Sequence, residues 1–543
     1  MADAGDDWGD EWDIVADLVV VGSGAAAAAA ALTASSRRAG VVVLEKASFT
    51  GGTTGKSGGV MWVPANPVMK ARGIADPRDQ ALRYLARTAY PIRFRADEPT
   101  LGLAANEYAL LETIYDRGGE ALEALVAAGG FVLEGVDYPD YYAGLPENAA
   151  PLGRVVQPRF PDGWRRGIDP TGGQLLVDGL LSAAEAHGAR VLLEHRVAHL
   201  IRDDSGRVLG VEARTGTRTV LVGARRGVVF GTGGFLHDEE LVRTYLRGPV
   251  LGGAASESAT GDFVRIGIEA GARFGNMSHA WWSQCAVELA VKHRVTSKDV
   301  YSPFGDSMVM VNRHGERVVN EKAVYNERGQ IHAVWDPSRL EYPNLLLFMV
   351  FDQAVMESID PSRFRWPIPL PGDEVPSIIV SAPDLPALAA ALRERLVALE
   401  PHTGGVRLAD DFEATLAATI DRFNRYADAG LDEDFGRGSS AIERTWAGPP
   451  RGANPLAAMH RFRSDGPYHC VIVGPGALDT KGGPVVDGRA RVLDADGIPI
   501  PGLYGAGNCV SSPAGQAYWG PGGTIGPAVT FGYVAAMDAT ASA

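Results

Sequence analysis

The sequence contains few of the features that mark disulfide-bonded, metal-binding or membrane-spanning proteins. Only three of its 543 residues are cysteines, and Cys285, Cys470 and Cys509 are too widely spaced to predict a disulfide framework or a metal site. No apolar run is long enough to span a bilayer, and the acidic N-terminus lacks the basic residues of a signal peptide. We therefore expect a cytoplasmic protein without a metal or a transmembrane segment, with peripheral membrane contact left open.

Positive charge is also scarce. The chain has 66 acidic and 51 basic side chains, and its formal net charge of -15 argues against a nucleic-acid partner. No lysine, arginine or histidine occurs after Arg491, and the first histidine is His187. The length predicts two or more cores, or one large core with an insertion. Neither the electron acceptor nor the oligomeric state is indicated.

A nucleotide-binding pattern opens the chain. DLVVVGSGAAAAAAAL, residues 17–32, has a β-branched run, a glycine turn at Gly22 and Gly24, and a helix-forming run in which Ala27 takes the third position of the pattern. The amino end of this helix would face a pyrophosphate. A second apolar run, VVVLE, ends at Glu45, whose carboxylate would bind an adenosine ribose and disfavour a 2′-phosphate. These features predict a bound dinucleotide.

The same glycine-rich pattern recurs at intervals along the chain. EKASFTGGTTGKSGGVMW follows the second strand, GVVFGTGGF covers residues 227–235, and GLYGAGN covers residues 502–508. A chain that returns to its cofactor near the C-terminus carries an insertion. We therefore expect an α/β fold with a discontinuous Rossmann-like domain, residues 1–281 and 466–543, and an inserted α+β domain, residues 282–465, that caps the substrate.

Together these motifs resemble the flavoprotein group that includes fumarate reductases and 3-ketosteroid dehydrogenases, and the resemblance covers nearly the whole chain. It implies FAD as the cofactor. Some members attach FAD to a histidine in the second motif; this chain has none there, so we expect non-covalent binding. The residues expected to bind the cofactor are Gly22, Gly24, Ala25, Ala26, Glu45, Lys46, Gly52, Thr53, Thr54, Ser57, Gly58, Gly59, Thr232, Gly233, Gly507, Asn508, Gly523, Thr524 and Ile525.

The uncharged segment AYWGPGGTIGPAVTFGY, residues 517–533, suits a neutral carbonyl compound. The hydroxyl of Tyr518 and the amide of Gly522 can both donate to a ketone oxygen, since glycine lets a ligand approach the backbone closely. Two donors would stabilise an enolate, so that a weak base removes the neighbouring proton while flavin N5 takes a hydride from the next carbon. A helix is expected from about Pro527, with its positive end by the flavin.

This segment also resembles the 3-ketosteroid Δ1-dehydrogenases, and the resemblance assigns three tyrosines. Tyr518 would polarise the ketone, Tyr325 in VVNEKAVYNE would be the base, and Tyr141 in DYPDYYAGLP would assist it. Tyr138 and Tyr142 are alternatives to Tyr141. The sequence departs from the family at Trp519, where proline is usual, and this indole would narrow the pocket or stack on a ring.

The resemblance therefore implies an FAD-dependent dehydrogenase that introduces a C=C bond next to a ring ketone, first of all a 3-ketosteroid 1,2-desaturase. A smaller cyclic ketone of the cyclohexanone type and Δ4 desaturation of a steroid are alternatives within the same chemistry. A fumarate-reductase-like enzyme and a non-catalytic flavin-binding protein are alternatives of a different kind.

Overall fold

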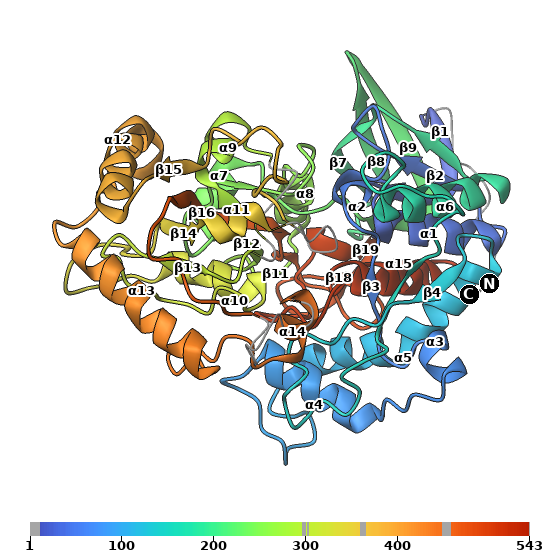
Figure 1. Cartoon of the computed structure of the whole chain (residues 1–543). Helices are drawn as coiled ribbons and strands as arrows, with labels where there is room; N and C mark the ends of the chain where they lie inside the picture. Colours follow the sequence, from blue (N-terminus) through green and yellow to red (C-terminus); the bar gives the residue numbers. More distant parts are fainter. Residues whose placement is uncertain (1–10, 296–299, 301–302, 359–364, 448–457, 542–543) are drawn as a thin grey trace. The chain divides into compact units, whose positions relative to one another are not determined.

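The computed structural model describes residues 11–295, 300, 303–358, 365–447 and 458–541, and the chain forms two compact units. Unit 1 consists of Met1–Tyr245, Ala255–Ala280 and Asp479–Ala543, and unit 2 of Leu246–Ala254 and Trp281–Leu478 (Figure 1). Unit 1 is therefore discontinuous in sequence and unit 2 is inserted into it. The boundary at which unit 2 ends and unit 1 resumes, after Leu478, lies within the strand β16 (Tyr468–Thr480).

A mostly parallel sheet forms the centre of unit 1. Its main path has the order β18 (Arg491–Leu493), β19 (Pro499–Gly505), β9 (Arg218–Phe230), β1 (Ile14–Val21), β2 (Val41–Leu44) and β6 (Arg190–Leu192). The strands from β19 to β6 run parallel to their neighbours, and β7 (Arg196–Arg202) and β8 (Val208–Thr215) extend the sheet antiparallel from β9. Continuous valine runs in β1 and β2 are buried, as expected of parallel strands covered on both faces.

Helices and short strands complete unit 1. The helices are α1 (Ala25–Ser36), α2 (Gly52–Lys56), α3 (Pro67–Ala71), α4 (Arg78–Ala89), α5 (Ala105–Ala127), α6 (Gly172–Ala186), α7 (Glu239–Tyr245), α8 (Asp262–Ala270), the short 3₁₀ helix η2 (Gly507–Cys509) and α15 (Ile525–Ala539). The short strands are β3 (Met61–Trp62), β4 (Leu133–Gly135), β5 (Val155–Pro158), β11 (Phe274–Gly275) and β17 (Gly483–Pro484).

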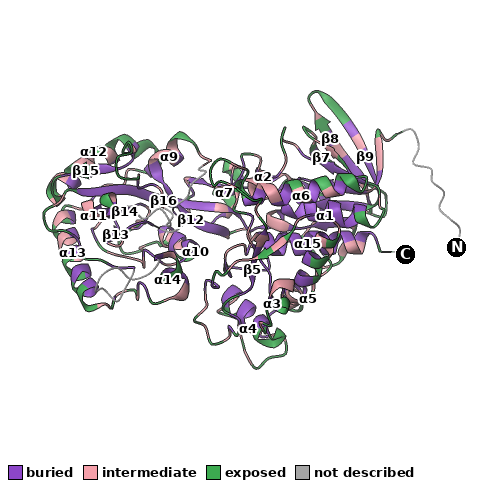
Figure 2. Cartoon of the chain, turned by 45° about the vertical axis from the view of Figure 1, so that its right-hand side comes forward, coloured by how far each residue is buried: buried purple, intermediate pink, exposed green. Residues whose placement is uncertain are grey.

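Small residues bring α1 and α15 into close contact. The eight alanines of α1 are all buried (Figure 2), and a Cβ added at Gly532 of α15 would lie 2.2 Å from the carbonyl oxygen of Ala26. Because alanine and glycine lose little or no side-chain entropy on burial, this close contact costs little entropy. It fixes the start of α1, which follows the nucleotide turn.

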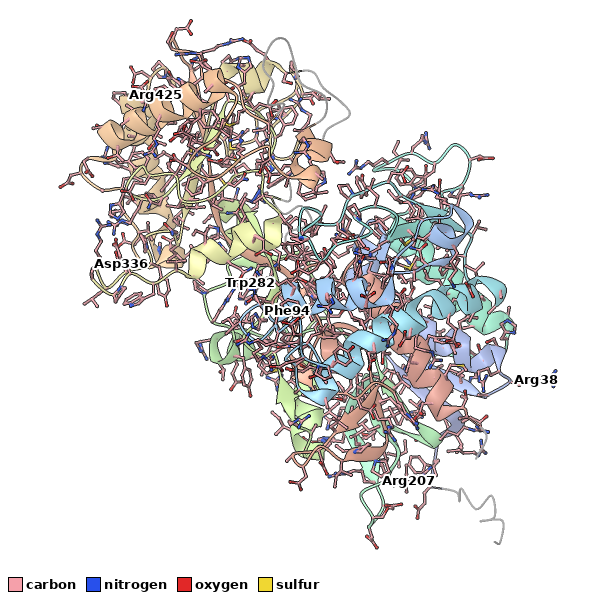
Figure 3. The ribbon with its side chains drawn as sticks, turned by 90° about the horizontal axis from the view of Figure 1, so that it is seen from below. Arg38, Phe94, Arg207, Trp282, Asp336 and Arg425 are labelled. Atoms are coloured by element: carbon pink, nitrogen blue, oxygen red, sulfur yellow. The ribbon has the colours of Figure 1, made fainter. Side chains whose placement is uncertain are left out.

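Two exposed arginines of unit 1 lie at turns. Arg38, just after α1, and Arg207, between β7 and β8, are exposed and extend outward (Figure 3). Among the described residues, no helix has both the length and the apolar character needed to cross a membrane.

Unit 2 is built on a mainly antiparallel sheet. Its main path has the order β10 (Gly252–Gly253), β16, β14 (Leu347–Asp352) and β13 (Met308–Val311), and β12 (Ala280–Ala286) and β15 (Val380–Ala382) also pair with β16. Its helices are α9 (Val287–Lys292), α10 (Tyr325–Gly329), the 3₁₀ helix η1 (Gln330–Ala333), α11 (Gln353–Glu357), α12 (Leu385–Thr403), α13 (Phe412–Ala429) and α14 (Ala441–Ala447).

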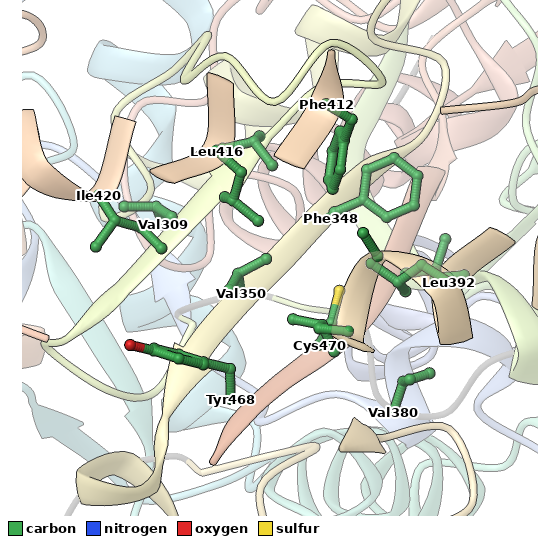
Figure 4. Packing of buried hydrophobic residues seen from close by; sticks show 14 of the residues in the cluster. Val309, Phe348, Val350, Val380, Leu392, Phe412, Leu416, Ile420, Tyr468 and Cys470 are labelled. Carbon is green, nitrogen blue, oxygen red and sulfur yellow. The ribbon is translucent and has the colours of Figure 1, made fainter. Parts of the chain in front are cut away.

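Alternate side chains of this sheet form two apolar clusters. Phe348 and Val350 of β14 belong to one cluster with Leu392 of α12 and Leu416 of α13 (Figure 4). The residues that alternate with them along β14, such as Met349, belong to the second cluster. This alternation is the period of two expected of a strand buried on both faces.

Candidate active site

The nucleotide turn lies between β1 and α1. Gly22 has a φ of +99°, and a Cβ there would lie 2.6 Å from the carbonyl oxygen of Gly231, so only glycine fits. Gly24 is the N-cap of α1, and the first amide of the helix, at Ala25, donates to Thr54 Oγ1 at 3.2 Å. The turn thus brings the start of the helix against the second glycine-rich segment.

Glu45 lies directly after β2 and is buried. Its Oε2 accepts the hydroxyl of Ser23 at 2.6 Å, and its Oε1 accepts the amide of Ala47 at 2.8 Å. The Ser23 hydroxyl in turn accepts the amide of Gly51 at 3.0 Å. Since each carboxylate oxygen has a second lone pair, Glu45 can still accept ribose hydroxyls.

The second glycine-rich segment is ordered by its own polar residues. It forms α2, which includes Gly52, Thr53 and Thr54, and the hydroxyl of Ser57 donates to Thr54 O at 2.7 Å and accepts the amide of Gly59 at 3.1 Å. Gly58 and Gly59 pack against the backbone of Gly172 at the start of α6. This segment is therefore a packed structure rather than a mobile loop.

Lys46 has a different environment from the other predicted cofactor residues. Its ammonium forms an ion pair with Asp262 at 2.8 Å and donates to Thr260 at 2.6 Å. The structure thus joins Lys46 to the start of α8, and a contact with the cofactor stays a prediction.

The later glycine segments follow the ends of β9 and β19. Thr232 and Gly233 come directly after β9, and Gly507 and Asn508 form η2 after β19. Because these two strands are parallel neighbours, their carboxyl ends lie at the same edge of the sheet.

Two buried ionisable residues near these segments were not assigned to the site from the sequence. Asp479 accepts the amide of Gly234 and the side-chain amide of Asn508, both at 3.0 Å, and burial raises its pKa to about 6. The Lys481 ammonium is also buried and donates to Ala517 O at 2.6 Å, directly before Tyr518. Both belong to the motif DTKGG, residues 479–483.

The arrangement at the nucleotide turn fits a dinucleotide cofactor. Gly22 makes the tight turn, Gly24 allows a phosphate to approach the backbone, the amino end of α1 favours negative charge, and Glu45 offers acceptors for a ribose. These are groups that the ADP part of FAD requires.

Tyr518 and Tyr141 lie in contact within unit 1. Tyr518 is buried, and its ring meets that of Tyr141 edge-on, with centroids 5.3 Å apart and an interplanar angle of 79°. The amide of Tyr141 donates to Trp519 O at 2.9 Å, whereas the Tyr142 hydroxyl accepts the amide of Tyr518 at 3.2 Å. Tyr138 is 37% exposed. Of the three candidate tyrosines, the structure thus places the ring of Tyr141 against that of Tyr518.

The glycines after Tyr518 bring a backbone amide near its ring. Gly522 has a φ of +88°, and none of the described residues accepts its N–H. A Cβ at Gly523 would lie 3.0 Å from Cδ2 of Tyr518, so this glycine lies against the phenol ring. The expected helix is present as α15, with Thr524 as its N-cap and Pro527 in its first turn.

Trp519 packs inside unit 1. Its ring stacks on Trp62, with centroids 5.5 Å apart, and its Nε1 donates to Thr88 Oγ1 at 3.0 Å. The side chain is fully buried. Because protein groups hold the indole, the expectation that it narrows the substrate pocket has no support from its packing.

Tyr325 belongs to unit 2, where it begins α10. It is 7% exposed and its ring stacks on Trp446, with centroids 6.4 Å apart. Arg328, on the same helix, is fully buried and donates to Glu321 O at 2.8 Å and Val300 O at 2.7 Å. Burial lowers the pKa of Arg328 to about 9, although its Coulomb interactions with Glu321 and Tyr325 oppose this change.

A buried ionic network holds the segment before Tyr325. The Glu321 carboxylate accepts Arg317 at 2.8 and 2.9 Å and Arg437 at 3.1 Å, and Arg317 also pairs with Asp432 at 3.0 Å. Burial by itself would raise the pKa of Glu321, but the two arginines lower it to about 2. The segment is thus fixed by charges that are fully paired within unit 2.

A model of the FAD binding domain family matches residues 17–525. The chain belongs to this family. It is 32% identical to the 4-oxocyclohexanecarboxylate 2-dehydrogenase of Sinomonas cyclohexanicum, covering 96% of this chain and 92% of the relative. It is also 32% identical to the 3-oxosteroid 1-dehydrogenase of Mycolicibacterium smegmatis, covering 97% of both chains.

A solved structure of this FAD-dependent family has the same fold. The 3-ketosteroid Δ1-dehydrogenase of Sterolibacterium denitrificans, in complex with 1,4-androstadiene-3,17-dione, matches with a TM-score of 0.79 and 27% identity over 97% of this chain and 99% of that chain. The predicted fold class, FAD as the cofactor and the class of FAD-dependent oxidoreductase are therefore confirmed. The chain is a member of the 3-ketosteroid and cyclic-ketone dehydrogenases.

Proposed function

We propose that the enzyme introduces a double bond next to a ring ketone whose oxygen is held by the Tyr518 hydroxyl and the Gly522 amide. The observation that supports this most is the contact between Tyr518 and Gly523, one residue from an amide that no described residue accepts. Two donors on one oxygen stabilise the negative charge of an enolate and so acidify the neighbouring carbon.

In this proposal Tyr325 removes the proton from that carbon, with assistance from Tyr141. A phenol is a poor base near neutral pH unless a neighbour stabilises its anion. Arg328 supplies a buried positive charge on the same helix as Tyr325. FAD, when bound, supplies the acceptor for the hydride that leaves the next carbon.

The FAD itself would be held by unit 1. Gly22 and Gly24 would admit its pyrophosphate to the amino end of α1, and Glu45 would bind its ribose. The amino end of α15, next to Gly523 and Thr524, would favour negative charge on the flavin ring.

A 3-ketosteroid is the first proposed substrate, with desaturation between carbons 1 and 2. The 3-oxosteroid 1-dehydrogenase relatives support it. A smaller cyclic ketone is the second candidate, because the 4-oxocyclohexanecarboxylate 2-dehydrogenase is equally similar in sequence. The buried indole of Trp519 favours neither. Steroid Δ4 desaturation is an alternative with support only from a shared fold.

A dicarboxylate substrate, as in a fumarate reductase, has less support. Such a substrate needs arginines that are free to form bidentate pairs. Arg317 is buried and paired with Glu321 and Asp432, and Arg491 is paired with Asp487 at 2.7 Å.

The two catalytic tyrosines can be tested by removing their hydroxyls. Tyr518→Phe and Tyr325→Phe should keep bound flavin and lose roughly a hundredfold or more of the turnover, the usual size of acid–base assistance. Tyr468→Phe is the matched control, since it removes a buried hydroxyl that donates to Arg463 O at 2.9 Å. Full turnover in either test variant would exclude that tyrosine from the mechanism.

The substrate class can be tested by anaerobic reduction of the bound flavin. The holoenzyme would be mixed with 4-androstene-3,17-dione, cyclohexanone or 4-oxocyclohexanecarboxylate, and the flavin absorbance followed. The ketone that bleaches the flavin fastest identifies the class, and the product structure gives the position of the new bond. A flavin that stays oxidised with every ketone would indicate a binding protein without turnover.

A further inference from the structure

One tryptophan of unit 1, Trp62, contacts the segment that carries both proposed hydrogen-bond donors to the ketone, the Tyr518 hydroxyl and the Gly522 amide. The amide of Trp62 donates to Gly522 O at 3.1 Å, and its indole stacks on Trp519, the residue after Tyr518, at 5.5 Å. A Cβ at Gly520 would lie 2.5 Å from Cδ1 of Trp62, and one at Gly526 would lie 1.9 Å from Trp62 O. Trp62 therefore contacts the Tyr518–Gly526 segment along most of its length.

The indole of Trp62 is itself fixed by a buried carboxylate. Its Nε1 donates to Asp140 Oδ1 at 2.7 Å, and the other oxygen of Asp140 accepts Arg154 at 2.5 Å and Asn148 at 3.0 Å. The Arg154 guanidinium lies over the Trp62 ring at 5.4 Å and forms a two-bonded pair with Asp76. Asp140 and Arg154 are fully buried, so this arrangement is shielded from solvent.

Asp140 also connects the buried cluster of Trp62, Asp140 and Arg154 to Tyr141, the third proposed site residue of unit 1. It directly precedes Tyr141, whose amide donates to Trp519 O and whose ring contacts Tyr518. The Trp519 carbonyl accepts a second bond, from the hydroxyl of Tyr84, at 2.9 Å. Tyr141, Tyr518 and the Gly522 carbonyl are therefore all held by contacts with the same buried cluster.

We propose that Trp62, held by Asp140, is the positioning residue that sets the distance and direction between the Tyr518 hydroxyl and the Gly522 amide. Two donors stabilise a developing negative charge only if both point at one oxygen, and an error of a fraction of an ångström weakens both bonds. Loss of the Trp62–Asp140 bond lets the indole shift, and both donors shift with it. This inference rests on the proposed function.

The test compares Trp62→Phe and Asp140→Asn with a matched control. Trp62→Phe keeps a ring to stack on Trp519 and removes the indole N–H; Asp140→Asn keeps the shape and removes the charge. Trp164→Phe is the control, because Trp164 also contacts an aromatic ring, that of Phe160 with centroids 4.2 Å apart, and donates its Nε1 to a carbonyl, Pro170 O at 2.9 Å.

Each holoenzyme would be titrated with 4-nitrophenolate, an anionic mimic of an enolate, and with cyclohexanone, a neutral ketone, and binding followed in the flavin spectrum. Both test variants should keep flavin, bind 4-nitrophenolate at least about tenfold more weakly, as expected when a bond to a charged group is lost, and bind cyclohexanone within about threefold of the parent. Turnover should fall with phenolate binding, and Trp164→Phe should match the parent in all readouts.

Equal weakening of phenolate and ketone binding, or a lower unfolding temperature with phenolate binding unchanged, would overturn the positioning role. If Trp62→Phe does not fold, Asp140→Asn decides. Tyr518→Phe is measured in parallel. If it retains turnover, the proposed function fails. If Tyr518→Phe loses turnover while the two test variants keep the turnover and phenolate binding of the parent, only the inference about Trp62 is refuted.

Discussion

Gly522 has a backbone conformation that glycine adopts far more readily than other residues. With its φ of +88°, an added Cβ would lie 2.4 Å from Val60 O, so a side chain would be strained by both conformation and contact. The proposed ketone-binding amide therefore depends on the absence of a side chain at this residue.

Gly522→Ala should lower the unfolding temperature and reduce turnover severalfold or more. Gly129→Ala separates the two causes, because Gly129 has nearly the same φ, +87°, but nothing within 4 Å of the added Cβ. The control should show only the conformational cost, about 1–3 kcal/mol, with turnover unchanged. Thermal unfolding and steady-state turnover of the two variants measure this; equal behaviour of both would contradict a steric role for Val60.

Residue by residue, the sequence predicts local motifs better than distant contacts. The order of strand, glycines and helix, followed by an acidic residue, located Gly22, Gly24 and Glu45. Spacing along the chain does not indicate which of three neighbouring tyrosines packs its ring against that of Tyr518, because that depends on the path of the loop. It also gave no reason to single out Trp62, whose partners Asp140 and Gly522 are far away in sequence.

At the scale of elements, runs of apolar residues coincide with strands and helices. MVMVN, residues 308–312, contains β13, LLLFMVF, residues 345–351, covers β14 except Asp352, and LPALAAALRERLVALE, residues 385–400, lies within α12. The buried charges could not be predicted in the same way. Arg317, Glu321 and Asp432 look like solvent-exposed charges in the sequence, and only tertiary packing brings them together.

The carboxylate of Glu321 should make unit 2 sensitive to acid. Because the pKa of Glu321 in the folded chain, about 2, is below its ordinary value of 4.5, its contribution to stability is present above pH 4.5 and is lost as the pH falls towards 2. Glu321→Gln should destabilise the protein by about 3 kcal/mol at neutral pH, and this difference from the parent should shrink in acid.

Thermal unfolding of the parent and of Glu321→Gln between pH 7 and pH 3 measures that difference. Glu357→Gln provides the control, since Glu357 pairs with Arg463 at 2.7 Å in an exposed ion pair. Its loss should change the stability of the protein little at any pH. A difference between parent and Glu321→Gln that stays constant with pH would exclude this account.

For the whole molecule, the sequence predicted residues 282–465 as a domain inserted into a discontinuous one, and unit 2 of the structure consists of Leu246–Ala254 and Trp281–Leu478. The prediction was possible because the glycine-rich segments recur on both sides of the middle region. The steroid or ring size that the enzyme accepts was not predictable, because it depends on a few side chains from segments distant in sequence.

Flavin attachment is also a property of the whole molecule. No histidine precedes His187 in the sequence, so the second motif has no residue of the type that attaches FAD in some relatives. Heat or acid denaturation followed by centrifugation should therefore leave the yellow flavin in the supernatant, with the mass of intact FAD. A pellet that stays yellow after washing would refute non-covalent binding.

The last strand and helix of unit 1 impose an order on its synthesis. β19 pairs with β9 within the central sheet, and α15 packs on α1, so the nucleotide-binding layer lacks two of its parts until the segment that follows unit 2 has left the ribosome. Most of unit 2 emerges earlier. A nascent chain stalled before β19 should therefore be unable to retain FAD, which places cofactor loading after the synthesis of unit 2.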